Sequence, residues 1–480
     1  MDAAQHWIDG AWRTDGSLRE TVAVYTGTRH ATYHSAGAAL AEEAISVARR
    51  TFDRTSWAHQ PRLRSQVLLE LADAITARRD EIARHIAVEN AKVVAHCLHE
   101  TNAAISEARY YAGLARAIFG RVTEIDAGKQ SIFAHEPIGV TAIIVPWNAP
   151  STLLLRSLGP ALAAGCTVVL KGAHQTSSVN RLYAEALANC PSLPAGVVNI
   201  VHGDLEMSQT LCQHPEVDVV SFTGSSSTGK AIMAAGAPTL KRLSLELGGK
   251  APAIVFDDAD MDVAVREITN GLIPHAGQMC TAIARIMVQD SAWTSFVPKL
   301  AEALGGITTG DPLDETVRMG PLFTEDAAQR YERDIASARQ AGETILDGAI
   351  QSGHPLGNVV SPALYAIEGT AHRLVQDELF APIGMLERFS TEEEATVSAN
   401  ATRYGLAASV HSRDHARTRR VARALKSGTV WINCHNRLFA EAETGGYRES
   451  GLGRLHGLEG LADFMETKHI YAEYGQLPTG

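Results

Sequence analysis

The chain has few cysteines, and they do not form any pattern that binds a metal or builds a disulfide scaffold. Its 480 residues include six cysteines and 19 histidines. The cysteines show no CxxC pair and no Cys/His spacing typical of zinc sites, and the histidines do not cluster. We therefore expect no metal site and a reducing compartment. The cysteines are Cys97, Cys166, Cys190, Cys212, Cys280 and Cys434.

Long runs of one residue type are also missing. The formal net charge of −11 is spread along the chain without a stripe of lysine and arginine, so nucleic acid is not an expected partner. No apolar run reaches the length of a membrane span, and the stretch from Met1 to Trp7 lacks the basic-then-apolar pattern of a signal peptide. We expect a cytoplasmic protein with no membrane partner.

The length and the pattern of apolar residues predict an α/β fold. A chain of 480 residues exceeds one hydrophobic core, so two or three domains are expected. From Gly139 onward, short Val- and Ile-rich runs alternate with helical patterns, which predicts a parallel sheet covered on both faces, with ligands at the carboxyl ends of its strands. A second α/β region is expected at about 249–440, and a hairpin at 120–133. The expected strands are 140–145, 166–171, 197–201, 217–222 and 251–256, and the expected early helices are 38–54, 60–79, 80–94 and 100–119.

Two short runs carry residues suited to covalent chemistry at a carbonyl group. Cys280 follows Gly277 and Gln278, which allow a tight bend that exposes a sulfur atom and leaves a backbone N–H free. A thiolate can attack a carbonyl carbon, and fixed N–H donors can stabilise the resulting oxyanion. Glu246 lies 34 residues earlier, before two glycines, and could activate water as a general base. Alone, each residue is more often structural: a buried thiol or a solvated turn.

Together, the runs Leu245-Glu246-Leu247-Gly248-Gly249-Lys250 and Gly277-Gln278-Met279-Cys280 resemble the signatures of the aldehyde dehydrogenase superfamily. The resemblance implies that Cys280 attacks an aldehyde, Asn148 in Pro146-Trp147-Asn148 helps to hold the oxyanion, and Glu246 activates the water that releases the acid. It also implies a Rossmann-like dinucleotide-binding domain at 1–118 and 138–248, a catalytic domain at 249–445, and a small β oligomerisation arm at 119–137 and 460–480. In this family the arm pairs with a C-terminal strand resembling 467–471, so a homodimer or homotetramer is expected.

The resemblance further implies NAD(P)⁺ as the cofactor. Lys171 matches a lysine that binds the adenosine ribose, but His174 stands where the family usually has a ribose-binding glutamate. A carboxylate would repel a 2′-phosphate and an imidazole would not, so NADP⁺ use is plausible. Ser225 matches the phosphate contact, while Glu378 and Phe380 match residues beside the nicotinamide and its ribose. The remaining expected cofactor residues are Ile144, Trp147, Gly203, Gly224 and Gly229.

Arg156 is the expected substrate residue, because branches of the family that oxidise acid semialdehydes or aromatic aldehydes resemble this chain in having an arginine there. An internal ion pair for Arg156 is an equally good interpretation. Pro274 replaces a second arginine of succinate semialdehyde enzymes, which weakens the semialdehyde alternative. Ser157 and Leu455 replace a lysine and a glutamate that many relatives place in a proton path.

The sequence thus predicts an NAD(P)-dependent enzyme that oxidises an aldehyde to its acid. Glu246 favours hydrolysis of the acyl-enzyme, since relatives that pass the acyl group to coenzyme A often lack this glutamate. A coenzyme A-acylating enzyme stays open as an alternative, as does a crystallin-like binding protein without turnover.

Overall fold

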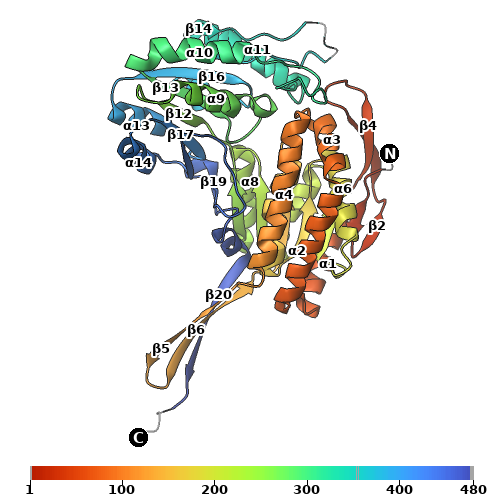
Figure 1. The fold of residues 1–480 in the computed structure, drawn as a ribbon. Coiled ribbons are helices and arrows are strands. Elements are labelled where there is room, and N and C mark those ends of the chain that lie inside the picture. The colour runs from red at the N-terminus through yellow and green to blue at the C-terminus, as the bar shows by residue number, and fades with distance from the viewer. Residues whose placement is uncertain (1–2, 353, 355, 476–480) are drawn as a thin grey trace.

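The computed structural model describes residues 3–352, 354 and 356–475. Met1 and Asp2 of the predicted first domain, and residues 476–480 of the predicted arm, lie outside the described residues. Figure 1 shows two bodies, each built around a sheet, and a narrow arm that projects from the lower one. The expected α/β class is confirmed.

The first sheet has the strand order β19-β11-β10-β7-β8-β9-β1-β2. Its centre, from β11 to β9, is parallel, whereas β19, β1 and β2 join antiparallel at the edges. The buried Val- and Ile-rich runs form the central strands as predicted, which is the pattern of a sheet covered on both faces. The strands are β1 His6–Ile8, β2 Ala11–Arg13, β7 Val140–Ile144, β8 Thr167–Lys171, β9 Val198–Val201, β10 Val219–Thr223, β11 Arg242–Glu246 and β19 Gly451–Leu452.

Helices cover both faces of this sheet. Successive side chains of β8 point to opposite faces of the sheet. Val168 and Leu170 belong to the apolar cluster that includes α2 to α6, while Val169 belongs to a second cluster with residues of α1, α7 and α8. The predicted helix at 38–54 is confirmed, and α4 begins and ends earlier than expected. The helices are α1 Ala38–Arg54, α2 Pro61–Ala77, α3 Arg79–Asn90, α4 Val94–Leu114, α5 Pro150–Ala164, α6 Ser177–Ala188, α7 Leu205–Gln213 and α8 Ser226–Gly236.

The second sheet has the order β14-β15-β16-β13-β12-β17-β18 and is parallel except for β14. It contains the expected strand at 251–256, which therefore does not belong to the first sheet. The strands are β12 Ala251–Val255, β13 Ile283–Gln289, β14 Glu343–Leu346, β15 Ala363–Ala366, β16 Ile383–Phe389, β17 Ala407–His411 and β18 Thr429–Ile432. The helices are α9 Met261–Leu272, α10 Trp293–Gly305, α11 Glu325–Ala341, α12 Arg373–Gln376, α13 Glu392–Asn400 and α14 His415–Ala424.

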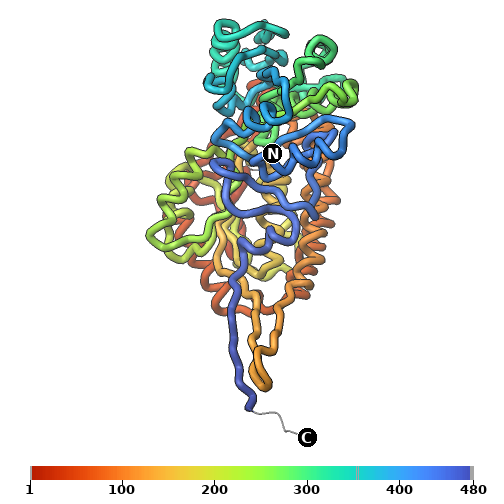
Figure 2. Tube along the Cα trace, turned by 90° about the vertical axis from the view of Figure 1, so that its left-hand side faces the viewer, coloured from red at the N-terminus to blue at the C-terminus, as the bar shows by residue number. Residues whose placement is uncertain are grey.

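The arm is a small sheet of β5 Arg121–Asp126, β6 Lys129–Pro137 and β20 Met465–Glu473. The predicted hairpin and its pairing with a C-terminal strand are confirmed, because β20 runs antiparallel to β6 over its whole length. Figure 2 shows the arm extending well away from both bodies. A separate hairpin, β3 Ser17–Val22 with β4 Arg29–Ser35, was not expected from the turn-rich sequence. The predicted domain boundaries stay a prediction.

Candidate active site

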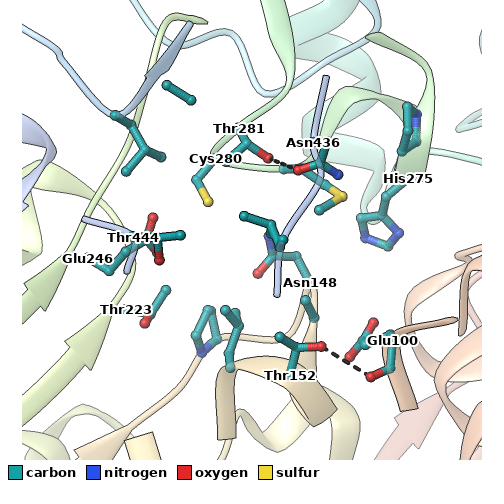
Figure 3. Close-up of a pocket in the computed structure, with 18 of the residues that line it drawn as sticks. Glu100, Asn148, Thr152, Thr223, Glu246, His275, Cys280, Thr281, Asn436 and Thr444 are labelled. Carbon is teal, nitrogen blue, oxygen red and sulfur yellow. Dashed lines mark hydrogen bonds between the residues drawn. The ribbon is translucent and has the colours of Figure 1, made fainter. Parts of the chain in front are cut away.

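The predicted catalytic residues meet in one cavity of about 700 Å³. Cys280, Glu246 and Asn148 all line it. Figure 3 shows the Cys280 sulfur pointing into the cavity, with Glu246 on one side and Asn148 on the other. The three residues come from different elements: Asn148 follows β7, Glu246 ends β11, and Cys280 lies in the loop before β13. The cavity therefore lies where the first sheet's carboxyl ends face the second body.

A strained bend presents Cys280 to this cavity. His275, Ala276 and Gly277 all have positive φ, at 53°, 52° and 73°. A side chain at Gly277 would also bring its Cβ within 2.5 Å of the Ala381 carbonyl carbon, so this position requires glycine. Strain of this kind is held in place by surrounding contacts and is common at functional sites.

Gln278 secures the bend and also holds Asn148. Its backbone and side-chain N–H groups donate to the His275 carbonyl at 3.0 and 2.9 Å, and its side-chain oxygen accepts from the Phe323 N–H at 3.0 Å. The Asn148 amide donates to the Gln278 carbonyl at 3.0 Å. A primary amide has two N–H donors, so this contact leaves one for a ligand. From the sequence Gln278 was expected only to allow the bend, and its contact with Asn148 was not anticipated.

Glu246 is the last residue of a strand and is 3% exposed, so it is not a solvated turn residue. The parallel register of β10 and β11 places Thr223 beside it. β11 was missed in the sequence because its first residues, Arg242 and Leu243, are only partly buried and do not show an uninterrupted apolar run.

Arg156 forms an ion pair with Glu246, which is the second of the two interpretations that the sequence left open. The arginine Nη2 lies 2.7 Å from Glu246 Oε2 and donates to the Thr223 hydroxyl at 3.0 Å. Arg156 also lines the cavity.

Groups around Cys280 shift the pKa of its thiol in opposite directions. Burial raises the pKa of the thiol well above its usual value, and the negative charge of Glu246 raises it further. The positive charge of Arg156 lowers the pKa of the thiol. In the same cavity, burial raises the pKa of Glu378 to about 7.

Several predicted cofactor residues continue the same cavity. Trp147, Gly224, Ser225, Glu378 and Phe380 line it. Ser225 is the N-cap of α8 and accepts from the Thr228 N–H at 3.2 Å, while Glu378 accepts from the Gly249 N–H at 3.0 Å. Phe380 meets Trp147 edge-on, with ring centroids 6.2 Å apart.

Lys171 and His174 lie beyond this cavity, at the carboxyl end of β8 and just after it. The Lys171 side chain is buried, and the His174 ring stacks on Tyr33 with centroids 5.9 Å apart. Burial lowers the pKa of both side chains. Ile144 ends β7 and is buried.

Gly203 and Gly229 also lie outside the cavity, and each allows a close approach between elements. A Cβ at Gly203 would meet the Ala36 carbonyl at 2.4 Å, and one at Gly229 would meet Leu247 at 2.6 Å. Both positions therefore need glycine for packing, whatever they bind.

These residues fit a bound dinucleotide. The first turn of α8 leaves N–H groups that favour a phosphate, because a helix N-terminus carries partial positive charge. Lys171 is a buried cation at the carboxyl end of β8, in the same sheet as β10, the strand before α8. The carboxyl side of this sheet thus offers both N–H donors and a cation to a dinucleotide.

Other residues of the site were not anticipated. Thr223 contacts Arg156, and Thr281 donates to the Asn436 side chain at 2.9 Å across the cavity wall. Ser157, expected to replace a lysine of a proton path, accepts a hydrogen bond from Ser221 at 3.0 Å, while Leu455 is buried. Only the pairing of distant segments brings these side chains together, and no local motif marks them.

Within residues 3–352, 354 and 356–475, no group of three or more His, Cys, Asp or Glu side chains is placed to hold a metal ion. Over the same ranges, every helix is too short or too polar to traverse a lipid bilayer.

Comparisons with known proteins agree with the geometry. The model of the aldehyde dehydrogenase family matches residues 12–470. Aldehyde dehydrogenase 1 of Tanacetum cinerariifolium is 36% identical over 95% of this chain and 92% of its own. 3-Sulfolactaldehyde dehydrogenase of Pseudomonas putida is 37% identical over 97% and 96%. A crystal structure of a betaine aldehyde dehydrogenase point mutant from Staphylococcus aureus, in complex with NAD⁺, superposes with a TM-score of 0.95 at 34% identity, covering 99% of this chain and 97% of that one.

The family match spans nearly the whole chain and includes the cavity where a cysteine, a glutamate and an asparagine converge. The relatives are similar over their full length and share the fold. The chain therefore belongs to the aldehyde dehydrogenase family of NAD(P)-dependent oxidoreductases.

Proposed function

We propose that the protein oxidises an aldehyde to its carboxylic acid through a thioester on Cys280. The observation that carries the proposal is that Cys280, Asn148 and Glu246 line one cavity, although they come from three separate elements. The Cys280 sulfur attacks the aldehyde carbon and forms a thiohemiacetal. A bound oxidised nicotinamide would supply the acceptor for the hydride that leaves this carbon, and the thioester would remain on Cys280.

Two N–H donors stabilise the oxyanion of the thiohemiacetal. One is the N–H of Asn148 that Gln278 does not use, and the other is the backbone N–H of Cys280. The Gln278 carbonyl keeps the Asn148 amide facing the loop that carries Cys280. An amide suits this role because it donates without titrating.

Glu246 then takes a proton from a water molecule that attacks the thioester, and the acid is released. Its position at the cavity wall supports hydrolysis over transfer to coenzyme A. Arg156 cannot accept the proton, because a guanidinium has donors only, so the carboxylate must do so itself.

We propose that NADP⁺ serves as a cofactor as well as NAD⁺. His174 brings no negative charge to the ribose end of the groove, and Lys171 lies nearby, at the end of β8. Burial lowers the pKa of His174, which keeps the ring neutral and able to donate one hydrogen bond to a phosphate. A ratio of kcat/KM above about 100 in favour of NAD⁺, equal to about 2.7 kcal/mol, would contradict this proposal.

We propose an uncharged aromatic aldehyde as the substrate class, in preference to an acid semialdehyde. The lysine and arginines of the cavity wall are each paired with a carboxylate: Lys92 with Glu100, Arg437 with Glu267, and Arg156 with Glu246. An acid semialdehyde would have to displace Glu246 to reach Arg156. Trp431, Leu153 and Leu438 supply apolar walls instead.

The buried histidines of the wall add no positive charge. Burial lowers the pKa of His96 and of His435 to about 4, and that of His275 well below its usual value. Comparing kcat/KM for benzaldehyde and succinate semialdehyde tests the class. A preference for the semialdehyde above about tenfold, or 1.4 kcal/mol, would overturn it.

We further propose that the protein works in the cytoplasm as a homodimer or homotetramer. The arm exposes Val122, Ile125, Ile470 and Tyr471, and exposed strands with apolar side chains are better covered by another subunit than left open. Sedimentation of the purified protein measures its mass. A monomer at micromolar concentration would rule the assembly out.

One assay tests the whole reaction. The purified enzyme is mixed with aldehydes and either cofactor, and the reduced nicotinamide is followed by absorbance. Cys280→Ala should abolish turnover while leaving the fold intact by circular dichroism. Near-normal activity of this variant would refute the mechanism. If the product formed only with added coenzyme A, the second step would be acyl transfer and not hydrolysis.

A further inference from the structure

Arg156 is the one charged residue of α5, a helix that is buried along almost its whole length. α5 is buried from Pro150 to Ala164 except at Thr152, and Arg156 itself is 5% exposed. A buried charge is costly unless a partner compensates it. The arginine must therefore be explained by what it touches.

Its contacts bridge the ends of two neighbouring strands. Nη2 lies 2.7 Å from Glu246 Oε2 at the end of β11 and 3.0 Å from the Thr223 hydroxyl at the end of β10. The β10 and β11 register pairs these two residues directly. A donor shared between them holds the Glu246 carboxylate on the α5 side of the cavity, with its other oxygen left for water.

The same charge faces the nucleophile. Three charged groups act on Cys280: Glu246 from β11, Glu378 from the segment after α12, and Arg156 from α5. The two carboxylates oppose formation of a thiolate, and the guanidinium favours it. Because the Arg156–Glu246 pair has no net charge, it weakens the repulsion between the carboxylate and a thiolate in the same cavity.

We infer that Arg156 is a positioning residue for the reaction: it orients Glu246 for attack of water on the thioester and supplies the positive charge that lets the carboxylate lie beside Cys280. This inference rests on the proposed role of Glu246 as the general base. It assigns Arg156 to the acyl-enzyme step, and the aldehyde is bound by other walls of the cavity.

The test uses the full-length enzyme with NAD⁺ and benzaldehyde, and compares Arg156→Gln, Arg156→Lys, Glu246→Gln and the double variant Arg156→Gln/Glu246→Gln. Rapid mixing measures the burst of reduced nicotinamide, which reports acylation, and the steady rate after it, which reports deacylation. For Arg156→Gln we expect the burst to persist and kcat to fall about 10- to 100-fold, the range for loss of one hydrogen bond to a charged group, with KM little changed.

The other variants test whether Arg156 acts through Glu246. Arg156→Lys keeps the charge and should recover part of the lost rate. The double variant should deacylate no more slowly than Glu246→Gln alone, because the arginine acts through the glutamate and the two effects cannot add. Additive losses, or a kcat for Arg156→Gln equal to that of the unaltered enzyme, would overturn the inference. A Glu246→Gln variant with unchanged kcat would instead refute the proposed function.

A matched control separates charge loss from damage to the fold. Arg181 also lies 2.7 Å from a carboxylate, Glu185, but on α6 and away from the cavity. Arg181→Gln should keep the full kcat. Alkylation of Cys280 by iodoacetamide across pH gives a readout that needs no turnover: the Arg156→Gln profile should move to higher pH than that of the control. An unmoved profile would contradict the role of the charge.

Discussion

Two buried arginine–glutamate pairs in this molecule differ in how many of their hydrogen-bonding groups have a partner. Arg285 on β13 and Glu387 on β16 form two contacts of 2.6 Å, and the guanidinium also donates to the Ser398 carbonyl at 2.9 Å. Arg156 makes one contact with Glu246, and its Nε is buried without a hydrogen-bond partner among the described residues. The first pair lies in the interior of the second body, and the second lines the cavity.

The difference shows what each pair is for. A bidentate pair in which each guanidinium nitrogen donates a hydrogen bond joins neighbouring strands and leaves little for a ligand. A single contact leaves one carboxylate oxygen and several N–H donors available, which is what a group that must handle water requires. Incomplete pairing is therefore a mark of the reactive site here, and complete pairing a mark of the framework.

The largest expected effect comes from the glutamate of the incomplete pair. Glu246→Gln keeps the shape of the side chain but removes its basicity, so deacylation should slow about 10²- to 10⁴-fold, the usual contribution of general base catalysis. The initial burst of reduced nicotinamide should remain, since Cys280 still attacks. Loss of the burst together with the steady rate would mean that the glutamate acts before the thioester forms.

Breaking the Arg285–Glu387 pair should lower the stability of the fold and leave the catalytic rate unchanged. Glu387→Gln leaves Arg285 buried with a weakened partner, and removal of one partner of a buried pair destabilises by about 3–5 kcal/mol. We expect a lower midpoint in urea unfolding and an unchanged kcat per folded molecule at 25 °C. If kcat falls and the midpoint does not, the contrast between the two pairs is wrong.

The pH dependence of Cys280 sharpens the comparison further. Because burial and Glu246 raise the pKa of this thiol, its thiolate forms only at higher pH than that of an ordinary cysteine. Glu246→Gln removes a negative neighbour, so the pH profile of iodoacetamide alkylation should move to lower pH by about one unit, the scale of one nearby charge. Glu387→Gln is the control and should leave the profile in place.

The smallest effect is expected at a buried cation that has no carboxylate partner. Within the described residues Lys171 takes part in no salt bridge, unlike the two arginines, and it lies close to His174. His174→Glu would introduce the missing carboxylate, so kcat/KM with NADP⁺ should fall about tenfold relative to NAD⁺, as expected for one charge repulsion near a phosphate. His174→Gln, which adds no charge, should leave the ratio nearly as it is.

Much of the framework was accessible from the sequence. The Val- and Ile-rich runs of β7, β8, β9 and β10 were correctly predicted, because strands buried on both faces are apolar without interruption. β3 was missed since most of its side chains are exposed and most of its residues are polar. The strand β12 lies in the second sheet, within the second α/β region that was expected from about residue 249.

The residues of the cavity also divide into those that the sequence predicted and those that it did not. Cys280, Glu246 and Asn148 were found because the local motifs around them are distinctive, and the cofactor residues followed from the same resemblance. The contacts of Thr223 with Arg156 and of Gln278 with Asn148 were not predicted, since each joins residues that are remote in sequence.

The sequence by itself determined the α/β class and the family, and it supplied the cysteine that we propose as the nucleophile, because these depend on local patterns of residues along the chain. Only the tertiary structure decided the partner of Arg156, for which the sequence allowed either a substrate or an internal carboxylate. The reason is physical: the two side chains are 90 residues apart, and the pairing of β10 with β11 beneath α5 brings them within 2.7 Å in a buried place where a lone charge would be unstable.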